Sequence, residues 1–145
     1  MNDDRDEEAQ PAEQASGRSG RAEQHLAHPV PAFDLEEEAQ QLHREESWLK
    51  GTRSARTLVK EPDFRVVLIA LKRGARIEAH RAPGRISIQA LSGRLRVRAG
   101  DQIVELPAHH MVSLEPNIMH DVEAGADGDS TFLLTIAWPA QGSGA

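Results

Sequence analysis

Two hydrophobic periodicities divide the chain into a helical part and a strand-forming part. In residues 34–50, apolar residues recur at helical spacing and acidic residues fill the opposite side. From about residue 54 onward, apolar and polar residues alternate in short runs, and turn-forming Gly, Pro and Asp interrupt these runs about every 8–12 residues. Residues 1–31 follow neither periodicity. The apolar positions of the helical part are Leu35, Ala39, Leu42 and Leu49.

Residues 32–51 are predicted to contain one amphipathic helix. Asp34 has the character of an N-cap residue, with Glu37 three positions later as in a capping box. Gly51 follows the last turn and suits the C′ position that ends many helices. The apolar stripe is thin, so we expect this helix to pack on the surface of a larger unit.

About eight short strands are predicted in residues 52–140. No helical pattern separates them, so the pattern indicates an all-β, antiparallel sandwich or barrel rather than a βαβ fold. The predicted strands cover residues 57–60, 64–71, 86–91, 94–98, 102–106, 111–114, 120–124 and 131–138.

The net charge of −6 is unevenly distributed along the chain. Residues 1–50 carry thirteen Asp and Glu against five Lys and Arg, whereas residues 51–145 carry ten against twelve. Residues 1–31 are rich in acidic and small polar residues and hold too few apolar ones to offset the entropy of ordering. We therefore expect a disordered acidic tail at 1–31, a helix within 32–51 and a nearly neutral β domain at 52–140.

Several classes of protein are excluded by composition. The chain has no cysteine, which removes disulfides, thiolate zinc sites and Cys nucleophiles. No apolar run approaches the roughly 18 residues of a membrane span, and the opening residues are acidic rather than a secretory signal, so we expect a cytoplasmic protein without a membrane partner. Phosphate-binding glycine loops and the Gly-x-Ser-x-Gly nucleophile motif are also absent.

One predicted strand, RLRVR, carries an arginine face made of Arg94, Arg96 and Arg98. A nucleic-acid site would need a basic stripe with aromatic residues for base stacking, and the chain has few aromatics, so we expect no nucleic-acid partner. Two interpretations stay open. The arginine face is a solvated sheet surface that discourages edge pairing, or the acidic helix or tail folds back over it and is held there by the helix's apolar residues.

The histidines are the main candidates for functional residues. His80 ends the strand-like segment GARIEAH, and His120 follows EPNIM and opens a predicted strand. His109 and His110 are adjacent and would point to opposite faces of an extended segment. The remaining histidines read as solvated residues of the tail and helix; they are His25, His28 and His43.

These residues resemble the motifs of the cupin superfamily over about residues 55–138. The first motif has a Gly, a first His and a last Gly at positions that are occupied here by Gly74, His80 and Gly93. In the second motif, Pro107-Ala108-His109 stands where Pro-Ala-Gly is usual. Pro116-Asn117-Ile118-Met119-His120 matches a Pro-Gly-x-x-His turn, with Asn as a natural substitute for Gly at positive φ. The resemblance to a small, RmlC-like single-domain cupin implies a double-stranded β-helix, or jelly-roll barrel, with an internal pocket.

The departures from these motifs concern a metal site. Metal-binding cupins present three histidines and a glutamate, and this chain keeps only His80 and His120, with Ala82 and Ile86 in the other two places. The resemblance therefore implies at most a weak site for one divalent ion (Zn, Fe, Mn or Ni), completed by water or an external ligand. Glu78 shares strand parity with His80 and could face inward. The alternative is a pair of hydrogen-bonded histidines without a metal.

We expect a small-molecule site lined by His80, Ala82, Ile86, Ile88 and His120. Two functions remain open: a binding or regulatory module, and a small metal-dependent enzyme of dioxygenase or isomerase type. Loss of two of four ligands favours the module. A metal-free epimerase that needs a tyrosine is excluded because the chain has none. The resemblance also implies a homodimer.

Overall fold

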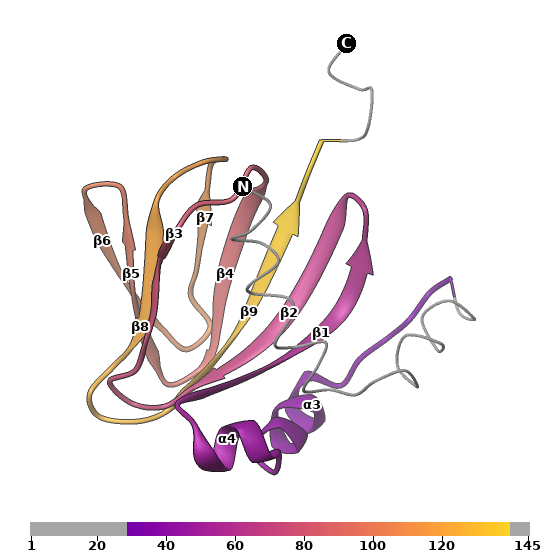
Figure 1. The fold of residues 1–145 in the computed structure, drawn as a ribbon, viewed down its shortest axis with the longest axis vertical. Coiled ribbons are helices and arrows are strands. Elements are labelled where there is room, and N and C mark those ends of the chain that lie inside the picture. The colour runs from indigo at the N-terminus through magenta and orange to yellow at the C-terminus, as the bar shows by residue number, and fades with distance from the viewer. Residues whose placement is uncertain (1–28, 140–145) are drawn as a thin grey trace.

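The computed structural model describes residues 29–139, which form two facing β-sheets with two short helices on the outside of one sheet (Figure 1). The chain enters through helix α3 (Leu35–Leu42) and helix α4 (Glu46–Lys50). Nine strands follow: β1 (Arg53–Glu61), β2 (Phe64–Leu71), β3 (Arg76–His80), β4 (Arg85–Ser92), β5 (Arg94–Ala99), β6 (Gln102–Pro107), β7 (Met111–Leu114), β8 (His120–Ala124) and β9 (Ser130–Ala137).

The strand order identifies the fold as a jelly roll. One sheet has the order β1-β2-β9-β4-β7 and the other the order β3-β8-β5-β6, and the paired strands in both are antiparallel. Neighbouring strands come from distant parts of the chain, as in the Greek-key connections of double-sheet jelly rolls. The predicted all-β fold class is confirmed, as two facing sheets rather than a closed barrel.

The predicted strands match the observed ones closely. The segments 64–71, 111–114 and 120–124 are reproduced as β2, β7 and β8. One strand, β3, is missing from the eight predicted strands, although its segment GARIEAH is strand-like in sequence. The other main difference is β1, which begins at Arg53 and pairs with β2 from end to end. Its first half was missed because it contains buried polar residues, Ser54 and Arg56, which break the apolar pattern.

The continuous apolar run of β2 is explained by burial of both of its faces. Val67, Ile69 and Leu71 lie in the core between the sheets. Leu68 and Ala70 point the other way, into a second cluster beneath the helices with Leu42, Trp48 and Leu58. A strand that meets apolar neighbours on both sides loses the polar positions of a half-exposed strand.

The single predicted helix is wrong: the chain forms two helices separated by residues 43–45. The break reorients the second helix, so that Trp48 is 7% exposed and Leu49 is 65% exposed. An unbroken helix would have carried Leu49, seven residues after the buried Leu42, toward the sheet. Tertiary packing of Trp48 therefore decides the geometry here.

Of the two predicted ends of the helical segment, the N-cap is confirmed and the C′ residue is wrong. Asp34 is the N-cap of α3, and its side chain accepts hydrogen bonds from the amides of Glu36 and Glu37. Gly51 is not a left-handed C′ residue, because its φ is −122°. Residues 1–28 of the predicted acidic tail lie outside the described residues.

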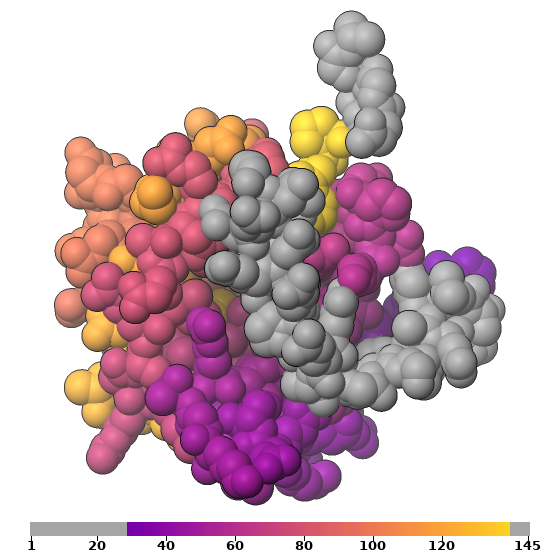
Figure 2. All heavy atoms as spheres, in the orientation of Figure 1, coloured from indigo at the N-terminus to yellow at the C-terminus, as the bar shows by residue number. Residues whose placement is uncertain are grey.

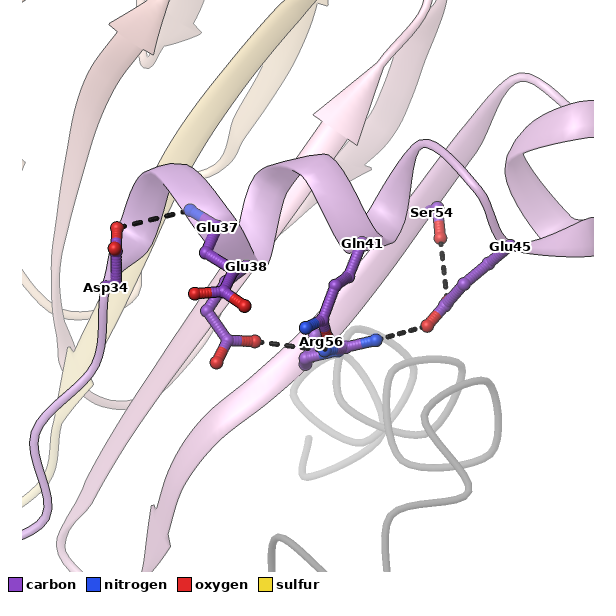
Figure 3. A network of polar contacts seen from close by, with 7 residues as sticks. All are labelled: Asp34, Glu37, Glu38, Gln41, Glu45, Ser54 and Arg56. Carbon is purple, nitrogen blue, oxygen red and sulfur yellow. Dashed lines mark hydrogen bonds and ion pairs between the residues drawn. The ribbon is translucent and has the colours of Figure 1, made fainter.

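The helices do not cover the arginine face of Arg94, Arg96 and Arg98. The interpretation that the acidic helix folds back over this face is therefore wrong. The helices lie on the outer side of β1 and β2, away from strands β5 and β6 that belong to the other sheet (Figures 1 and 2). Their acidic residues contact Arg56 of β1 instead. Arg56 donates to Glu38 Oε1 at 3.0 Å and to Gln41 Oε1 at 2.6 Å, and it forms an ion pair with Glu45 (Figure 3).

The arginine face is a solvated surface of mixed charge. Arg94, Arg96 and Arg98 point outward, while Leu95 and Val97 are buried between the sheets. Arg96 Nε lies 2.9 Å from Glu105 on β6, and Arg98 Nε lies 3.9 Å from Asp121 on β8. β5 is an inner strand of its sheet, so these arginines do not protect a sheet edge.

Several turn residues at the glycine positions of the cupin motifs have a positive φ. Gly74 and Gly93 have φ of 74° and 78°, and a Cβ at Gly93 would lie 2.4 Å from the Asp129 carbonyl oxygen. Asn117 has a φ of 66° and His109 a φ of 75°. His109 therefore adopts the conformation expected of the glycine it replaces.

His109 and His110 lie in the turn between β6 and β7 rather than in an extended segment, and both are exposed. The condition under which they would point to opposite faces, an extended segment, is therefore not met. Between residues 29 and 139, no helix has the length and apolar character needed to cross a bilayer.

Candidate functional site

His80 and His120 lie opposite each other on neighbouring strands. His80 ends β3 and His120 begins β8, and the two are paired across the ladder. Their ring centroids are 4.5 Å apart, with the ring planes inclined at 56°. His120 is 2% exposed, and His80 is half-buried. We call the end of the jelly roll that contains this pair the histidine end.

Both imidazoles face the space between the sheets. Val122 and Ala124 of β8 belong to the inner core, and alternation places His120 on the same side. Asp121 points outward, where Arg76 and Arg98 lie within 3.6 Å and 3.9 Å of its carboxylate. Residues that pair directly across a ladder share one face, so His80 also points inward.

An irregularity in β3 brings His80 into this position. Ile77 pairs with Val122, and regular antiparallel pairing from there would place Ala79 opposite His120. A register shift between Ile77 and His80 places His80 opposite His120 instead. The same shift breaks the parity between Glu78 and His80, and Glu78 is exposed. The expectation that Glu78 faces inward is therefore wrong.

The hydrogen bonds of the two rings assign their tautomers. His80 Nδ1 lies 2.9 Å from the Glu78 carbonyl oxygen, and His120 Nδ1 lies 3.0 Å from the Ile118 carbonyl oxygen. A carbonyl oxygen only accepts, so each Nδ1 carries the proton and donates it. In the neutral rings the lone pair is then on Nε2, the atom that would bind a metal or accept a hydrogen bond from a ligand.

The other predicted site residues also face the space between the sheets. Ala82, Ile86 and Ile88 are almost fully buried in the core between the sheets. The amide of Asn117 donates to the Ala82 carbonyl oxygen at 2.8 Å, which joins the loop after His80 to the loop before His120. The histidines therefore face the space between the sheets from the four-stranded sheet, and the isoleucines face it from the five-stranded sheet.

The described residues offer only part of a metal site. No group of three His, Cys, Asp or Glu suitable for a metal exists in residues 29–139. Two rings that bind one ion through Nε2 at about 2.0–2.1 Å have centroids about 4.5–5.2 Å apart. The observed 4.5 Å lies at the short end of that range, and it is also an ordinary distance for a pair of aromatic rings.

Sequence reasoning missed two residues near this inner surface, Arg65 and Trp138. The Arg65 guanidinium carbon lies 5.6 Å from the centroid of the Trp138 ring. Arg65 is 9% exposed, and Trp138 packs against the inner core. The available signal was parity, because Arg65 shares its face of FRVVLIAL with Val67 and Ile69.

A shallow surface depression lies elsewhere, on helix α4. It is lined by Glu45, Glu46, Ser47, Lys50 and Gly51. Lys50 and Glu46 form an exposed ion pair at 2.7 Å across it. This depression contains none of the predicted site residues.

Comparison with known proteins identifies the fold through solved structures alone. No protein-family model matches the chain, and no curated protein matches it. A conserved protein of unknown function from Streptococcus pyogenes is 22% identical, with a TM-score of 0.62 over 76% of this chain and 89% of that one. A cupin superfamily protein from Desulfitobacterium hafniense is 16% identical, with a TM-score of 0.56 over 60% of this chain and 78% of that one.

A third similar structure is the cupin domain of an XRE-family transcriptional regulator from Enterobacter cloacae. It is 18% identical, with a TM-score of 0.55 over 61% of this chain and 98% of that domain. These likenesses agree with the order of the strands in the two sheets. The chain is a small protein with the cupin fold.

Proposed function

We propose that this protein is a small-ligand-binding or regulatory module whose ligand occupies the histidine end of the jelly roll. The observation that carries the proposal is the pairing of His80 and His120, with both rings inward and both Nδ1 atoms bonded to backbone carbonyls. Two hydrogen-bonding groups of fixed orientation beside an aliphatic wall are typical of small-molecule sites.

A permanently bound metal is not required for this function. Ala82 and Ile86 stand where a full cupin metal site would have its other two ligands, and both side chains are apolar and buried. A divalent ion such as Zn, Fe, Mn or Ni would be held by the two Nε2 atoms, with water or ligand oxygens in the remaining positions. Such a site is expected to be weak.

The regulatory part of the proposal is supported by the fold's use in another protein. The structure from Enterobacter cloacae is one domain of a transcriptional regulator, and its whole length is similar to this fold. Ligand occupancy in the present chain would act on a partner or a second copy. We further propose a homodimer that uses the sheet edges formed by β6 and β7, where Ile103 and Met111 are 55% and 56% exposed.

The second candidate is a small metal-dependent enzyme of dioxygenase or isomerase type. It is favoured by one observation: the Nδ1 atom of each ring is hydrogen-bonded to a backbone carbonyl, which orients Nε2 as is usual in metal-binding histidines. Elemental analysis of protein purified without an affinity tag separates the two candidates. Stoichiometric Fe, Mn, Ni or Zn that disappears in His80→Ala would favour the enzyme, and substoichiometric metal would favour the module.

A fragment screen tests the module directly. Neutral fragments are screened by NMR against the full chain, and binders are compared among wild type, His80→Ala, His120→Ala and the control His110→Ala, which removes an exposed turn histidine. We expect binders that shift the methyl signals of Ile86 and Ile88, and we expect both site variants to weaken them while the control does not. Binders that ignore both site variants, or the absence of any binder, would contradict the proposal.

A further inference from the structure

The two helices cover only part of the outer face of the five-stranded sheet. They lie beside β1 and β2, at one edge of the strand order, whereas β4 and β7 lie at the other edge (Figure 1). Leu133 of β9 and Leu91 of β4 mark the border, because they pack against the apolar cluster beneath the helices. Beyond this border, the described residues leave the outer face of the sheet uncovered.

The uncovered part of this face carries almost no charge. Ile86 and Ile88 point into the core between the sheets, so alternation turns their neighbours outward. We call the outward residues of β4, β7 and β9 the bare face: Arg85, Ser87, Gln89, Leu91, Met111, Ser113, Leu133, Thr135 and Ala137. Arg85 is the one charged residue of this set, and none of the set is Asp or Glu.

The outer face of the four-stranded sheet has the opposite character. Its outward residues include Arg76, Arg94, Arg96, Arg98, Glu105, Asp121 and Glu123, all of which are charged. A sheet face in water normally carries polar and charged residues, whereas the centre of a protein interface is depleted of charge. The contrast between the two outer faces indicates that the bare face is a contact surface.

The shape of this side of the molecule favours a second copy as the occupant. The layer formed by α3 and α4 stands about 10–12 Å high beside the bare face, whose three strands are roughly 14 Å wide. A two-fold axis parallel to the strands places the helical layer of each copy over the bare face of the other. A two-fold axis across the strands would instead bring the helical layers onto each other and hold the bare faces apart.

The charges and the exposed apolar side chains agree with the first arrangement. The helical layer is acidic, with Glu36 and Glu37 exposed, and the bare face offers Arg85 and no carboxylate that would repel them. Hydroxyl and amide groups of the bare face can donate hydrogen bonds to carboxylates. Leu49 of α4 and Met111 of β7 are large apolar residues exposed on this side of the molecule, and the pairing brings these two surfaces together.

We propose that two copies of this chain pair about a two-fold axis parallel to the strands, with α3 and α4 of each copy against the bare face of the other. Each contact measures roughly 14 Å by 17 Å, so the two contacts bury about 1,000 Å² in total, the lower end for a specific interface. The dimer is therefore concentration-dependent. This inference rests on the homodimer of the proposed function and adjoins the β7 edge through Met111.

The test measures self-association of the full chain by sedimentation velocity as a function of concentration. Gln89→Glu adds a carboxylate to the bare face, and Leu49→Glu adds one to the helical layer; both positions are exposed, so both variants keep the fold. The matched control is Ala126→Glu, in the exposed turn between β8 and β9. Ile103→Glu tests a dimer that uses the β6 edge instead. Circular dichroism melts verify the fold of each variant.

A mixture of the two interface variants tests whether the helical layer acts on the other copy. Each variant alone has the same defect in both contacts of its dimer. A mixed dimer keeps one intact contact, between the helices of the Gln89→Glu chain and the bare face of the Leu49→Glu chain. We expect each variant alone to associate at least about tenfold more weakly than wild type and Ala126→Glu, and we expect the mixture to associate more tightly than either variant alone.

Wild-type association in Gln89→Glu would overturn this inference, and loss of the dimer in Ile103→Glu alone would leave the homodimer of the proposed function at the β6 edge. A mixture that associates no more tightly than the single variants would overturn the placement of the helical layer. A full chain that stays monomeric would overturn both the inference and the homodimer, but not ligand binding at His80 and His120. Residues 1–28 or another protein would then be the candidates to cover the bare face.

Discussion

Arg56 Nη1 lies 3.0 Å from Glu38 Oε1, and the two side chains are only 7% and 9% exposed. This ion pair joins β1 to α3, two elements that the sequence separates by a helix and a turn. Gln41 and Glu45 contact the same guanidinium, and Ser54 donates to Glu45 at 3.5 Å (Figure 3). The helical segment is therefore held to the sheet by a buried polar network as well as by the apolar cluster around Leu42.

Removal of the arginine should destabilise the protein more than removal of any exposed arginine. Arg56→Met leaves the carboxylates of Glu38 and Glu45 without their shared cation, and uncompensated buried charge costs about 3–5 kcal/mol. The control is Arg96→Met, since Arg96 and Glu105 form an exposed pair whose loss costs about 0–1 kcal/mol. Free energies of unfolding from urea titrations should differ accordingly. Equal values for the two variants would show that the network contributes no more than a surface pair.

Two N-terminal truncations should behave differently. Deletion of residues 1–30 should leave the melting temperature nearly unchanged. Deletion of residues 1–50 removes both helices and exposes Leu58, Leu68 and Ala70, so the melting temperature should fall by several degrees. Circular dichroism melts measure both values. The same melting temperature for both truncated chains would refute the docking of the helices as a source of stability.

The break between the helices predicts opposite outcomes for two leucines of similar sequence context. Leu42→Ala empties a fully buried position and should cost about 2–5 kcal/mol of unfolding free energy. Leu49→Ala changes an exposed side chain and should stay within about 0.5 kcal/mol of wild type. Urea unfolding of both variants gives the comparison. A large cost for Leu49→Ala would favour one continuous helix with Leu49 against the sheet.

The left-handed conformation of His109 should make glycine the better residue there. A non-glycine residue at φ of 75° is strained by about 1–2 kcal/mol, so His109→Gly should stabilise the protein by about 1 kcal/mol. The matched substitution His110→Gly, at a residue without positive φ, should be neutral or destabilising. Thermal unfolding of the two variants checks the sign. A loss of stability in His109→Gly would mean that the side chain makes a stabilising contact.

The sequence allowed the strands to be predicted because alternation reports directly on the two environments of a sheet. Leu95 and Val97 face the core and Arg94 and Arg96 face solvent, as their spacing indicates. The helix break was not predictable, since it depends on Trp48 packing against β-strand residues and on Glu45 reaching Arg56. Contacts between residues distant in sequence leave no local pattern.

The candidate site was predictable only in part, again because alternation along a strand is visible in the sequence and contacts between distant residues are not. His80, His120 and the isoleucines follow from the motif resemblance and strand parity. Glu78 was misplaced because a one-residue shift in β3 reverses parity, and no turn or glycine signal marks the shift. Arg65 was not among the predicted site residues, because it is a single charge within the otherwise apolar predicted strand 64–71.

The central claim is that His80 and His120 belong to one inward-facing ligand site, and long-range ¹H–¹⁵N NMR of the histidine rings tests it most directly. The tightest neutral fragment from the screen is titrated into the full chain while all ring nitrogens are observed. The account predicts protonated Nδ1 atoms in both rings before binding, and Nε2 signals of His80 and His120 that shift together with one midpoint while those of His109 and His110 stay unchanged. Protonation at Nε2, or a bound fragment that shifts only one ring or neither, would contradict it.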